Sequence, residues 1–333
     1  MKALVYMGPG RMEFQDVPDP IPGAGEVVVR TLASAICGSD LHGFREASPR
    51  RIPPLVMGHE TVGVIDEAGD DVDPAVVGRR VVIEPILGCG TCPWCREGAI
   101  NRCRDGRLLG RDLPGGFAER LAVPAGAAVV LPDDLETDVA VLIEPLANAI
   151  HVVASVPPAG ATVFVIGAGP IGLLMAHAAA LDGAARVLIS DPVVGRLERA
   201  SAQGFEALAG DDVSSAITEA TGGAGVDVVI DAAGYPATWA LGVEAARPGG
   251  RIVEVGLGAP RGELDYFSVL GKELTITGSY AWGETDFARS LRLVAEERID
   301  LSGWTSAMPL ADGERAFERL VGEDPPFKVV LTP

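Results

Sequence analysis

The stretch TVFVIGAGPIG, residues 162–172, joins a strand-like segment to a glycine-rich turn. Its first five residues are apolar or β-branched, which is typical of a buried strand, and the apolar run from Ile171 to Leu181 then predicts a helix. The last six residues fit the pattern G-x-G-x-x-G. Such a turn alone is a weak signal, but a strand before it and a helix after it form the context that dinucleotide binding requires.

Each glycine of this pattern has its own task. Gly167 permits the tight turn, Gly169 lets the backbone approach a pyrophosphate, and Gly172 lets the helix and the strand pack closely. The helix N-terminus, which begins with Pro170 and Ile171, would then face the phosphates. We therefore expect these five residues to bind a dinucleotide cofactor.

Asp191 follows Gly172 by 19 residues, at the end of the next predicted strand. A carboxylate there accepts hydrogen bonds from the adenosine ribose and repels a 2′-phosphate, so the sequence favours NAD over NADP. Arg196 leaves NADP open, because an arginine beside the ribose can accommodate the extra phosphate. An exposed helix arginine is the plainer interpretation of Arg196.

Strand-like and helix-like segments alternate around this motif, which predicts a doubly wound parallel sheet. The expected strands are 162–166, 186–190, 206–209, 226–230, 251–255 and 274–277, and the expected helices are 170–182, 195–203, 212–220 and 236–246. The first part of the chain is typical of a β domain, with short apolar runs between Gly and Pro turns at 26–31, 61–66, 80–83 and 118–123.

The predicted fold class is therefore α/β plus β. We expect a β-rich domain at 1–148, a dinucleotide-binding domain at 149–280 and a C-terminal segment at 281–333. That segment should contain a helix near 286–297 and a strand at 327–331, and it should return to the first domain.

The chain has 333 residues and a net charge of −19, from 27 basic and 46 acidic residues. This balance argues against nucleic acid or an anionic membrane as a partner, since both require a basic face. The N-terminus begins with the strand-like MKALVY and lacks the pattern of a signal peptide. We expect no membrane-spanning helix, because the run from Ile171 to Leu181 is too short. The sequence thus predicts a cytoplasmic protein.

Four of the five cysteines are closely spaced, as C-x2-C-x2-C-x7-C at Cys89, Cys92, Cys95 and Cys103. Thiolates this close are a soft, tetrahedral ligand set that selects zinc. A full set of four leaves no open position, so we expect a structural zinc in the lobe 86–106. Two disulfides are the alternative, which is disfavoured because cysteines two residues apart seldom bridge well. Cys37 is the thiol left over for different work.

A second candidate ligand set is spread along the first domain. Cys37 lies in CGSDLH, His59 and Glu60 lie in GHE, and Glu144 lies in LIEP. One thiolate, one imidazole and a carboxylate are acceptable zinc ligands, with water or substrate in the remaining position. Each residue by itself is unremarkable, since a single Cys is usually a buried apolar residue and a Glu is usually solvated.

Together these segments make the chain resemble the zinc-dependent medium-chain alcohol dehydrogenases, and most of all their sorbitol and threonine dehydrogenase branch. The resemblance runs essentially end to end and rests on CGSD at 37–40, GHE at 58–60, the four-cysteine lobe, GGFAE at 115–119, EPL at 144–146 and GAGPIG at 167–172. It implies a GroES-like catalytic domain, a Rossmann domain, and a homodimer or homotetramer. It also implies two zinc ions per chain, one catalytic and one structural.

The activity that the resemblance implies is reversible oxidation of an alcohol to a ketone, with hydride transfer to NAD. Cys37 and His59 should bind the catalytic zinc directly. Glu144 should stand where many members have a second cysteine, and it should bind directly or through water. Glu60 would also coordinate, in exchange with water during turnover.

Ser39 and His42 match the proton relay of this family. Histidine suits the last step because its usual pKa lies near the working pH. A glutamate ligand favours a hydroxylated substrate, which we expect to be a polyol, a sugar alcohol or an aminocyclitol. Three aromatic residues are candidates for the walls of the substrate pocket, namely Phe44, Phe117 and Trp282.

Other substrates and other classes of protein stay open. Ala281 stands where the sorbitol branch tends to carry an arginine, which argues against sorbitol itself. Small amino alcohols or diols, as used by threonine and butanediol dehydrogenases, are the alternative substrates. A non-catalytic NAD-binding paralogue is the alternative of another class, and a zinc-free quinone reductase is a further one. The presence of both ligand sets argues against these two.

Overall fold

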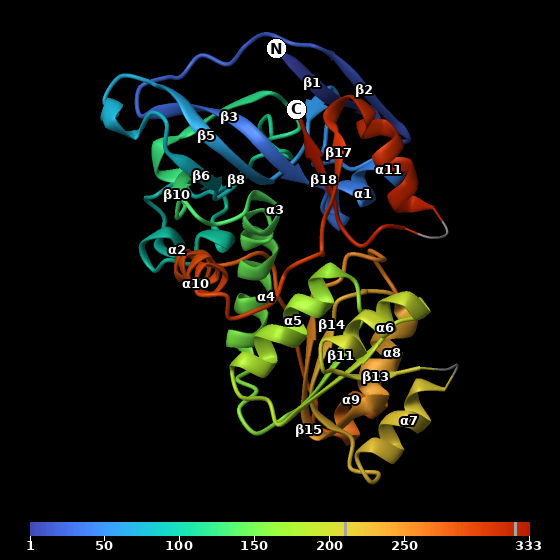
Figure 1. Ribbon diagram of the computed structural model, residues 1–333. Helices are drawn as coiled ribbons and strands as arrows, with labels where there is room; N and C mark the ends of the chain where they lie inside the picture. Colours follow the sequence, from blue (N-terminus) through green and yellow to red (C-terminus); the bar gives the residue numbers. More distant parts are fainter. Residues whose placement is uncertain (210–211, 323–324) are drawn as a thin grey trace. The chain divides into compact units, whose positions relative to one another are not determined.

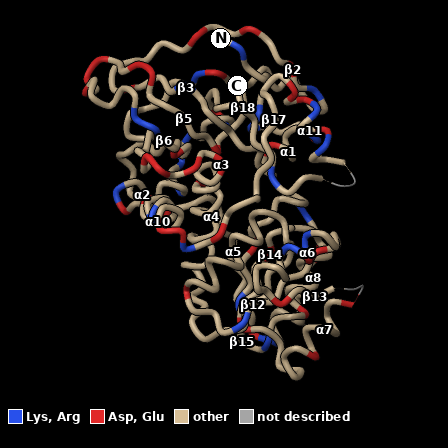
Figure 2. Tube along the Cα trace, viewed as in Figure 1, with Lys and Arg blue, Asp and Glu red and all other residues tan. Residues whose placement is uncertain are grey.

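A computed structural model describes residues 1–209, 212–322 and 325–333 of the chain (Figure 1). The chain divides into two compact units, one formed by Met1–Glu144 with Gly283–Pro333 and the other by Pro145–Trp282. Each unit has its own sheets and its own hydrophobic core. Charged residues of both signs are scattered along the two units (Figure 2).

The unit Pro145–Trp282 is built on a six-stranded parallel sheet of order β13-β12-β11-β14-β15-β16. The strands are β11 (Thr162–Ile166), β12 (Arg186–Ser190), β13 (Glu206–Leu208), β14 (Val226–Asp231), β15 (Ala246–Glu254) and β16 (Thr275–Gly278). The helices are α5 (Pro170–Leu181), α6 (Val194–Ala202), α7 (Val213–Ala220), α8 (Pro236–Ala245) and α9 (Tyr266–Gly271). The strand order reverses between β11 and β14, and ligands bind doubly wound sheets at such a switch point.

All six predicted strands of this sheet are confirmed. Strand β15 begins at Ala246 rather than at Arg251, because its first part pairs with β14 through a register shift between Val226 and Val228. Pro248 and two glycines in that part are typical of a turn, so the sequence predicted a later start of the strand. The central strands are continuous apolar runs because helices cover both faces of a parallel sheet.

The other unit consists mainly of short antiparallel strands. A seven-stranded sheet has the order β10-β6-β5-β3-β18-β17 with β9 paired to β3, and smaller sheets have the orders β2-β1-β4 and β7-β8. The strands are β1 (Lys2–Gly8), β2 (Arg11–Asp16), β3 (Glu26–Ala35), β4 (Leu55–Val56), β5 (Glu60–Ala68), β6 (Arg80–Ile83), β7 (Ile86–Leu87), β8 (Arg107–Leu108), β9 (Arg120–Pro124), β10 (Ala128–Val130), β17 (Ser306–Pro309) and β18 (Val329–Thr332).

Short helices connect these strands. They are α1 (Gly38–Arg45), α2 (Pro93–Arg96), α3 (Thr137–Ala140), α10 (Glu284–Ala295) and α11 (Gly313–Val321), with 3-10 turns at Pro74–Val76, Ile100–Arg102, Ala125–Ala127 and Leu310–Asp312. Helix α4 (Ile143–Ser155) begins in this unit and carries the chain into the other one.

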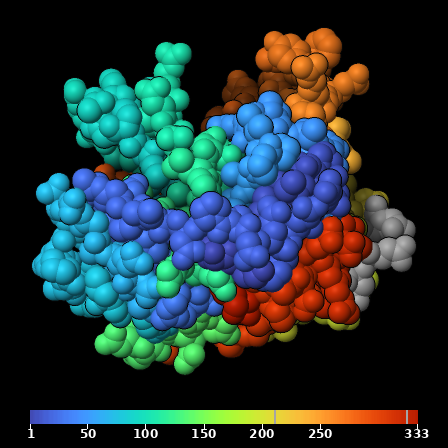
Figure 3. All heavy atoms as spheres, turned by 90° about the horizontal axis from the view of Figure 1, so that it is seen from above, coloured from blue at the N-terminus to red at the C-terminus, as the bar shows by residue number. Residues whose placement is uncertain are grey.

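The C-terminal segment packs into the core of the β-rich unit, beside the N-terminal strands (Figure 3). Strand β18 pairs with β3, and the Phe317 ring lies 5.2 Å from the Phe44 ring and 6.0 Å from the Phe117 ring. Phe44 and Phe117 are therefore packed in the core, and their place in the wall of a substrate pocket stays a prediction. Trp282, the third candidate, is also fully buried.

One helical stretch, Thr137–Ser155, passes a test of length and composition for a membrane span. The sequence analysis did not consider this stretch, which is long because α3 and α4 follow each other almost without a break. However, 67% of the apolar 18-residue window in this stretch is buried inside the structure, as in the core helix of a folded protein.

Candidate metal and cofactor sites

Helix α1 carries several of the candidate residues at its start. It begins directly after Cys37, whose extended backbone makes it the N-cap. Asp40 Oδ2 accepts a hydrogen bond from the Cys37 backbone N–H at 3.2 Å, which closes the first turn. A helix N-terminus favours negative charge, which partly offsets the cost of burying a Cys37 thiolate at this position. Ser39 and His42 lie three residues apart on the same helix and therefore share a face.

The glycines of two motifs hold the segment that carries His59. The Gly116 N–H donates to the Gly58 carbonyl at 2.8 Å. A Cβ at Gly58, where φ is +95°, would lie 2.6 Å from the Phe117 ring, and a Cβ at Gly116 would lie 2.0 Å from the Thr61 hydroxyl. Only glycine fits at these two positions, and the close backbone pairing fixes the start of β5.

Cys37, His59 and Glu60 come together in the β-rich unit. One ligand atom of each residue lies within 4.8 Å of the other two. His59 is 5% exposed and Glu60 is fully buried. One sulfur, one nitrogen and one oxygen at such distances fit a zinc ion with an open fourth position.

Glu144 stands in the first turn of α4 and is also buried. It is not a member of the close group of three residues. Its carboxyl nevertheless interacts electrostatically with His59, Glu60 and Cys37. The structure therefore places Glu144 near the group but farther out than Glu60.

Lys328 is a member of this site that the sequence analysis missed. Its Nζ donates to Glu60 Oε1 at 2.7 Å, and the two side chains are 5% and 0% exposed. Strand β18 begins directly after Lys328 and pairs with β3, which brings the lysine from the far end of the chain. A lone lysine outside any motif gives no local signal, so only the predicted return of the C-terminal segment could have pointed to it.

Asp40 and Arg51 form a second buried ion pair behind the metal-ligand candidates. Arg51 Nη2 donates to Asp40 Oδ1 at 3.2 Å and to Ser39 Oγ at 3.0 Å. The same Asp40 oxygen lies 3.5 Å from His59 Nδ1. This contact leaves Nε2 as the ring nitrogen for a metal, since a carboxylate behind a histidine ligand fixes its tautomer and orientation. Sequence analysis missed both residues, although Asp40 stands within the quoted CGSD segment.

Burial dominates the electrostatics of this site. Burial raises the pKa of the Cys37 thiol to about 11, and the charge of Glu60 adds to the effect. Burial also raises the pKa of Glu144 well above its usual value. The site contains four acidic groups, Cys37, Asp40, Glu60 and Glu144. If all of them ionise, the two buried cations, Lys328 and Arg51, balance only half of their charge. One divalent cation supplies the missing charge and would displace the protons, so the residues fit a zinc ion.

The four-cysteine lobe has its sulfur atoms already gathered. The four sulfur atoms lie within 4.8 Å of one another, and all the cysteines are free thiols. Backbone N–H groups of Cys89, Cys92 and Cys95 donate to cysteine sulfurs at 3.4 Å. Strands β7 and β8 close the base of the lobe. Such N–H···S contacts stabilise thiolates, so this set fits a four-coordinate zinc.

The glycine-rich loop sits where the strand order reverses. Gly167 has φ +101°, which favours glycine, and a Cβ at Gly172 would lie 1.8 Å from the Gly167 carbonyl oxygen. Gly169 is the N-cap of α5, and a Cβ added there would lie 3.8 Å from the Arg196 guanidinium, with no other described atom within 4 Å apart from those of its neighbours in the chain. The loop thus leaves the helix N-terminus open to an anionic group, as a dinucleotide needs.

Asp191 ties this loop to the end of β12. Its Oδ2 accepts from the Ala168 N–H at 2.9 Å, its Oδ1 accepts from the Val193 N–H at 2.8 Å, and its side chain is 3% exposed. Arg196 Nη1 lies 3.4 Å from Asp191 Oδ2, with its side chain 32% exposed. The arginine therefore partly neutralises the carboxylate, which the sequence alone did not show.

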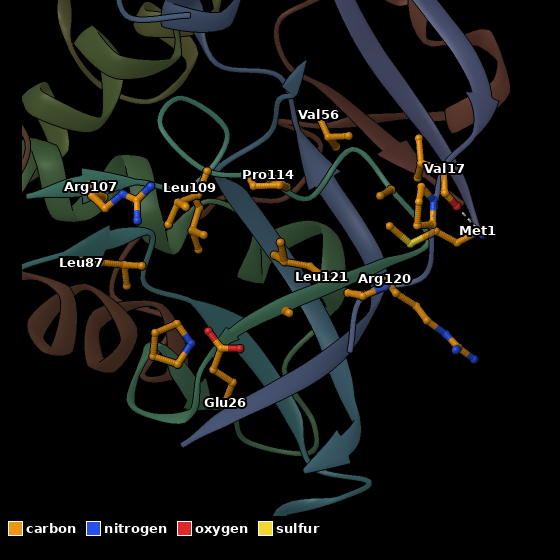
Figure 4. A pocket seen from close by; sticks show the side chains of 17 residues that line it. Met1, Val17, Glu26, Val56, Leu87, Arg107, Leu109, Pro114, Arg120 and Leu121 are labelled. Carbon is orange, nitrogen blue, oxygen red and sulfur yellow. Dashed lines mark hydrogen bonds between the residues drawn. The ribbon is translucent and has the colours of Figure 1, made fainter. Parts of the chain in front are cut away.

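The β-rich unit also contains a cavity of about 570 Å³, lined mainly by apolar side chains that include Val17, Leu109 and Leu121 (Figure 4). Its charged lining residues are Glu26, Arg107 and Arg120. None of the metal-ligand candidates lines this cavity, so it is separate from the chemistry described above.

Two family models match the chain. The alcohol dehydrogenase GroES-like domain matches residues 23–133, and the zinc-binding dehydrogenase matches residues 170–296. An L-threonine 3-dehydrogenase from Saccharopolyspora erythraea is 36% identical over 96% of this chain and 95% of its own length. A 2-dehydro-3-deoxy-L-galactonate 5-dehydrogenase from Pseudoalteromonas atlantica is 34% identical over 99% of this chain and 98% of its own length.

A solved structure extends the similarity to three dimensions. An alcohol dehydrogenase from Escherichia coli CFT073, complexed with NADH, has a TM-score of 0.92 and 32% identity, and the match covers 100% of this chain and 99% of the other. Identity at this level over nearly the whole length shows common family membership. The chain therefore belongs to the zinc-dependent medium-chain alcohol dehydrogenases, with a GroES-like and a Rossmann domain, and is an NAD(P)-dependent enzyme that oxidises secondary alcohols.

Proposed function

We propose that the enzyme oxidises a hydroxylated secondary alcohol, of the polyol, sugar-alcohol or aminocyclitol class, reversibly to a ketone and transfers the hydride to NAD. The observation that supports this most is the buried group of Cys37, His59 and Glu60, whose sulfur, nitrogen and oxygen atoms fit a zinc ion with a position left open for a substrate oxygen. The relative named for a deoxygalactonate fits the same substrate class. The relative named for threonine makes a small amino alcohol the second candidate.

The proposed metal content is two zinc ions per chain. Cys37 and His59, with Glu60 as the nearest carboxylate, would hold the catalytic ion, and Glu144 would reach it through water. The structural ion would be held by the lobe, through Cys89, Cys92, Cys95 and Cys103. A zinc ion at the first site supplies a Lewis acid that lowers the pKa of a substrate hydroxyl.

The chain's own residues would then carry the substrate proton away. Ser39 would receive it, and Arg51 prepares this step, because its donation to Ser39 Oγ directs the hydroxyl hydrogen of Ser39 toward another acceptor. His42, half-buried and three residues further along α1, would pass the proton to solvent. No hydrogen bond joins Ser39 to His42 within the described part of the chain, so a further hydroxyl group must bridge them.

Zinc content and the Cys37→Ser variant test this proposal. We expect about two zinc ions per chain in the wild type and about one in the variant, because serine is a poor zinc ligand. Turnover should fall by about a thousandfold or more, since one ligand of the Lewis acid is lost. NADH binding should stay within about twofold, because the cofactor loop is untouched. A Cys37→Ser variant with undiminished turnover would contradict the assignment.

The substrate class requires a separate screen. NAD reduction would be followed with polyols, aminocyclitols, amino alcohols and diols. Turnover confined to threonine or butanediol would favour the second candidate. A wild type that holds two zinc ions and binds NADH, yet oxidises none of these compounds, would indicate a non-catalytic paralogue.

The preference for NAD rests on Asp191, which would repel the 2′-phosphate of NADP. Asp191→Asn keeps the shape and one of the two acceptor oxygens but removes the charge, and it leaves Arg196 unneutralised. We expect NADPH to bind at least about tenfold more tightly to this variant, relative to NADH, than to the wild type. Arg196→Ala is the control. It removes the positive charge that could hold the 2′-phosphate, so it should bind NADPH more weakly than the wild type does. An unchanged preference in Asp191→Asn would argue against this role.

We also propose a homo-oligomer located in the cytoplasm. The free thiols suit a reducing compartment, where thiolates stay available for zinc. An exposed apolar surface on α9, the helix that precedes the edge strand β16 in the chain, supports self-association; it includes Tyr266, Phe267 and Leu270, which are 65%, 82% and 53% exposed. This surface fits both a dimer and a tetramer.

A further inference from the structure

Two carboxyl groups meet at the carboxyl end of the parallel sheet, where β14 ends at Asp231 and β15 ends at Glu254. The two residues are register partners, so their side chains leave the sheet on the same face. Asp231 is fully buried, and Glu254 Oε2 is buried without a hydrogen-bond partner in the described part of the chain. Two carboxylates this close repel each other, so one proton is favoured between them.

The surroundings make Asp231 the ionised partner. Its Oδ1 accepts from the Ala233 and Gly234 N–H groups at 2.8 and 2.9 Å, and its Oδ2 accepts from the Thr238 hydroxyl at 2.6 Å. Three donors and the N-terminus of α8 favour a negative charge there. The proton therefore resides on Glu254. Burial raises the pKa of Glu254 to about 7, and the charge of Asp231 and a hydrogen bond to it add to this shift.

The neighbouring elements bring no other charge to Glu254, as far as the described residues show. Strand β16, on the other side of β15, has no ionisable side chain, and α9 has one, Tyr266, which is 65% exposed. Helix α8 carries one, Glu244, which stands near the far end of the helix and accepts a hydrogen bond from the Ser214 hydroxyl. Lys272 donates to three backbone carbonyls instead. Asp231 is thus the group that sets the protonation of Glu254.

The turn that Asp231 holds, residues 231–234, lies against the cofactor loop. The Ala232 N–H donates to the Ile166 carbonyl at 3.0 Å, directly before the first glycine of the loop. A Cβ at Gly167 would lie 3.7 Å from this turn, and a Cβ at Gly172 would lie 3.4 Å from the Ala232 Cβ. A shift of the turn therefore reaches the glycines that approach the pyrophosphate.

We propose that Glu254 is a positioning residue for the cofactor: its protonated carboxyl donates to Asp231 and keeps the 231–234 turn in the geometry that binds the dinucleotide. The ionised form of Glu254 repels Asp231, which weakens the hydrogen bonds that Asp231 accepts from the Ala233 and Gly234 N–H groups. Cofactor binding is then weaker as well. This inference rests on the proposed use of NAD. Because the protonated form binds better, affinity is highest below neutral pH and falls as the pH rises through about 7.

NADH binding to the full-length chain, measured by fluorescence from pH 6 to 8.5, tests this inference. We expect the wild-type affinity to fall about threefold or more over this range. Glu254→Gln donates to Asp231 at every pH, so it should bind tightly and without this pH dependence. Glu254→Val has no donor and should bind at pH 6 about as weakly as the wild type does at pH 8.5. Glu219→Gln, at an exposed position on α7, is the matched control and should behave like the wild type.

Two results would overturn the inference. One is a Glu254→Gln variant that keeps the wild-type pH dependence, and the other is wild-type binding that does not change with pH. The infrared difference spectrum between the wild type and Glu254→Gln at pH 6 should contain the band of one protonated carboxyl. Failure of the wild type to bind NADH at any pH would instead contradict the proposed function.

Discussion

The stability of the β-rich unit depends on individual buried charges. Glu60 is fully buried beside Cys37 and His59, and Lys328 neutralises it from the C-terminal strand. A buried carboxylate without a counter-charge is costly, and the closest alternative counter-charge is the proposed zinc ion. Lys328 and the metal therefore stabilise the same carboxylate, which makes their effects on stability interdependent.

Lys328→Met should thus destabilise the metal-free protein more than the zinc-loaded protein. We expect a loss of about 3–5 kcal/mol in unfolding free energy without metal, since the variant leaves Glu60 buried and unpaired. With zinc bound, the loss should be roughly half of that, because the cation takes over part of the compensation. Denaturant unfolding with and without a chelator measures both values.

Lys2→Met is the matched control for this variant. Lys2 pairs with Asp16 at 2.8 Å, but the side chains are 45% and 80% exposed, so the loss should stay below about 1 kcal/mol. An equal loss for Lys328→Met in both metal states would show that the ion pair and the metal act independently.

Sequence motifs identify residues that stand in a recognisable local pattern, even where their partners in space are far away in the chain. The grouping of Cys37, His59 and Glu60 in space agrees with what the motifs predicted, whereas their binding of zinc stays a prediction. Lys328 and Arg51 escaped notice because their partners lie 268 and 11 residues away in the chain, and no spacing rule joins them. Buried ion pairs of this kind depend on tertiary packing rather than on sequence pattern.

Among the helices and strands, too, some could be predicted from the sequence and others could not. The six strands of the Rossmann domain and its helices α5 to α8 were predictable because long apolar runs alternate with glycine turns, whereas the six-residue α9 was not predicted. Helix α1 and the elements α11 and β17 were not predicted. Each is short, and α11 has many charged residues, so packing of one face against the N-terminal strands, rather than intrinsic propensity, stabilises it.

The four-cysteine lobe is an element whose stability depends on its metal. It has two short strands and two short helical turns, and its sulfurs repel one another once ionised. The Thr91 hydroxyl is the main cause that lowers the pKa of Cys89, to about 6, whereas desolvation raises that of Cys95 to about 12. Without a cation the four thiols therefore do not ionise together.

Cys95→Ser should lower stability before it lowers activity. We expect the loss of one zinc ion per chain and about 2 kcal/mol of unfolding free energy, which corresponds to several degrees in Tm. The turnover of the remaining folded enzyme should stay close to that of the wild type, because the lobe contributes no ligand to the other site. Thr91→Ala, which removes one hydrogen bond to Cys89 Sγ, is the control and should retain both zinc ions. Unchanged melting after loss of the lobe zinc would refute this expectation.

At the scale of the whole molecule, the net charge opposes association between chains, whereas one edge of the parallel sheet favours it. A charge of −19 keeps chains apart, yet one edge of the parallel sheet has no charge to protect it. Residues 274–280, LTITGSY, contain no Lys, Arg, Asp, Glu or Pro, and exposed edge strands of this kind pair with other chains. The opposite edge, β13, has only three residues, Glu206–Leu208. The β16 edge is therefore the better place for two copies to extend the sheet.

Phe267→Glu should disrupt such an assembly. The phenylalanine is 82% exposed in α9, next in the chain to β16, so the substitution places a charge on the proposed interface without disturbing a core. We expect light scattering to give the wild type at least twice the chain mass of 34.5 kDa, and Phe267→Glu a dissociation constant higher by about tenfold or more. Ile21→Glu, at a position 86% exposed in the other unit, is the matched control and should assemble like the wild type. A wild type of single-chain mass, or a Phe267→Glu variant that assembles as tightly as Ile21→Glu, would rule out this surface as the contact between chains.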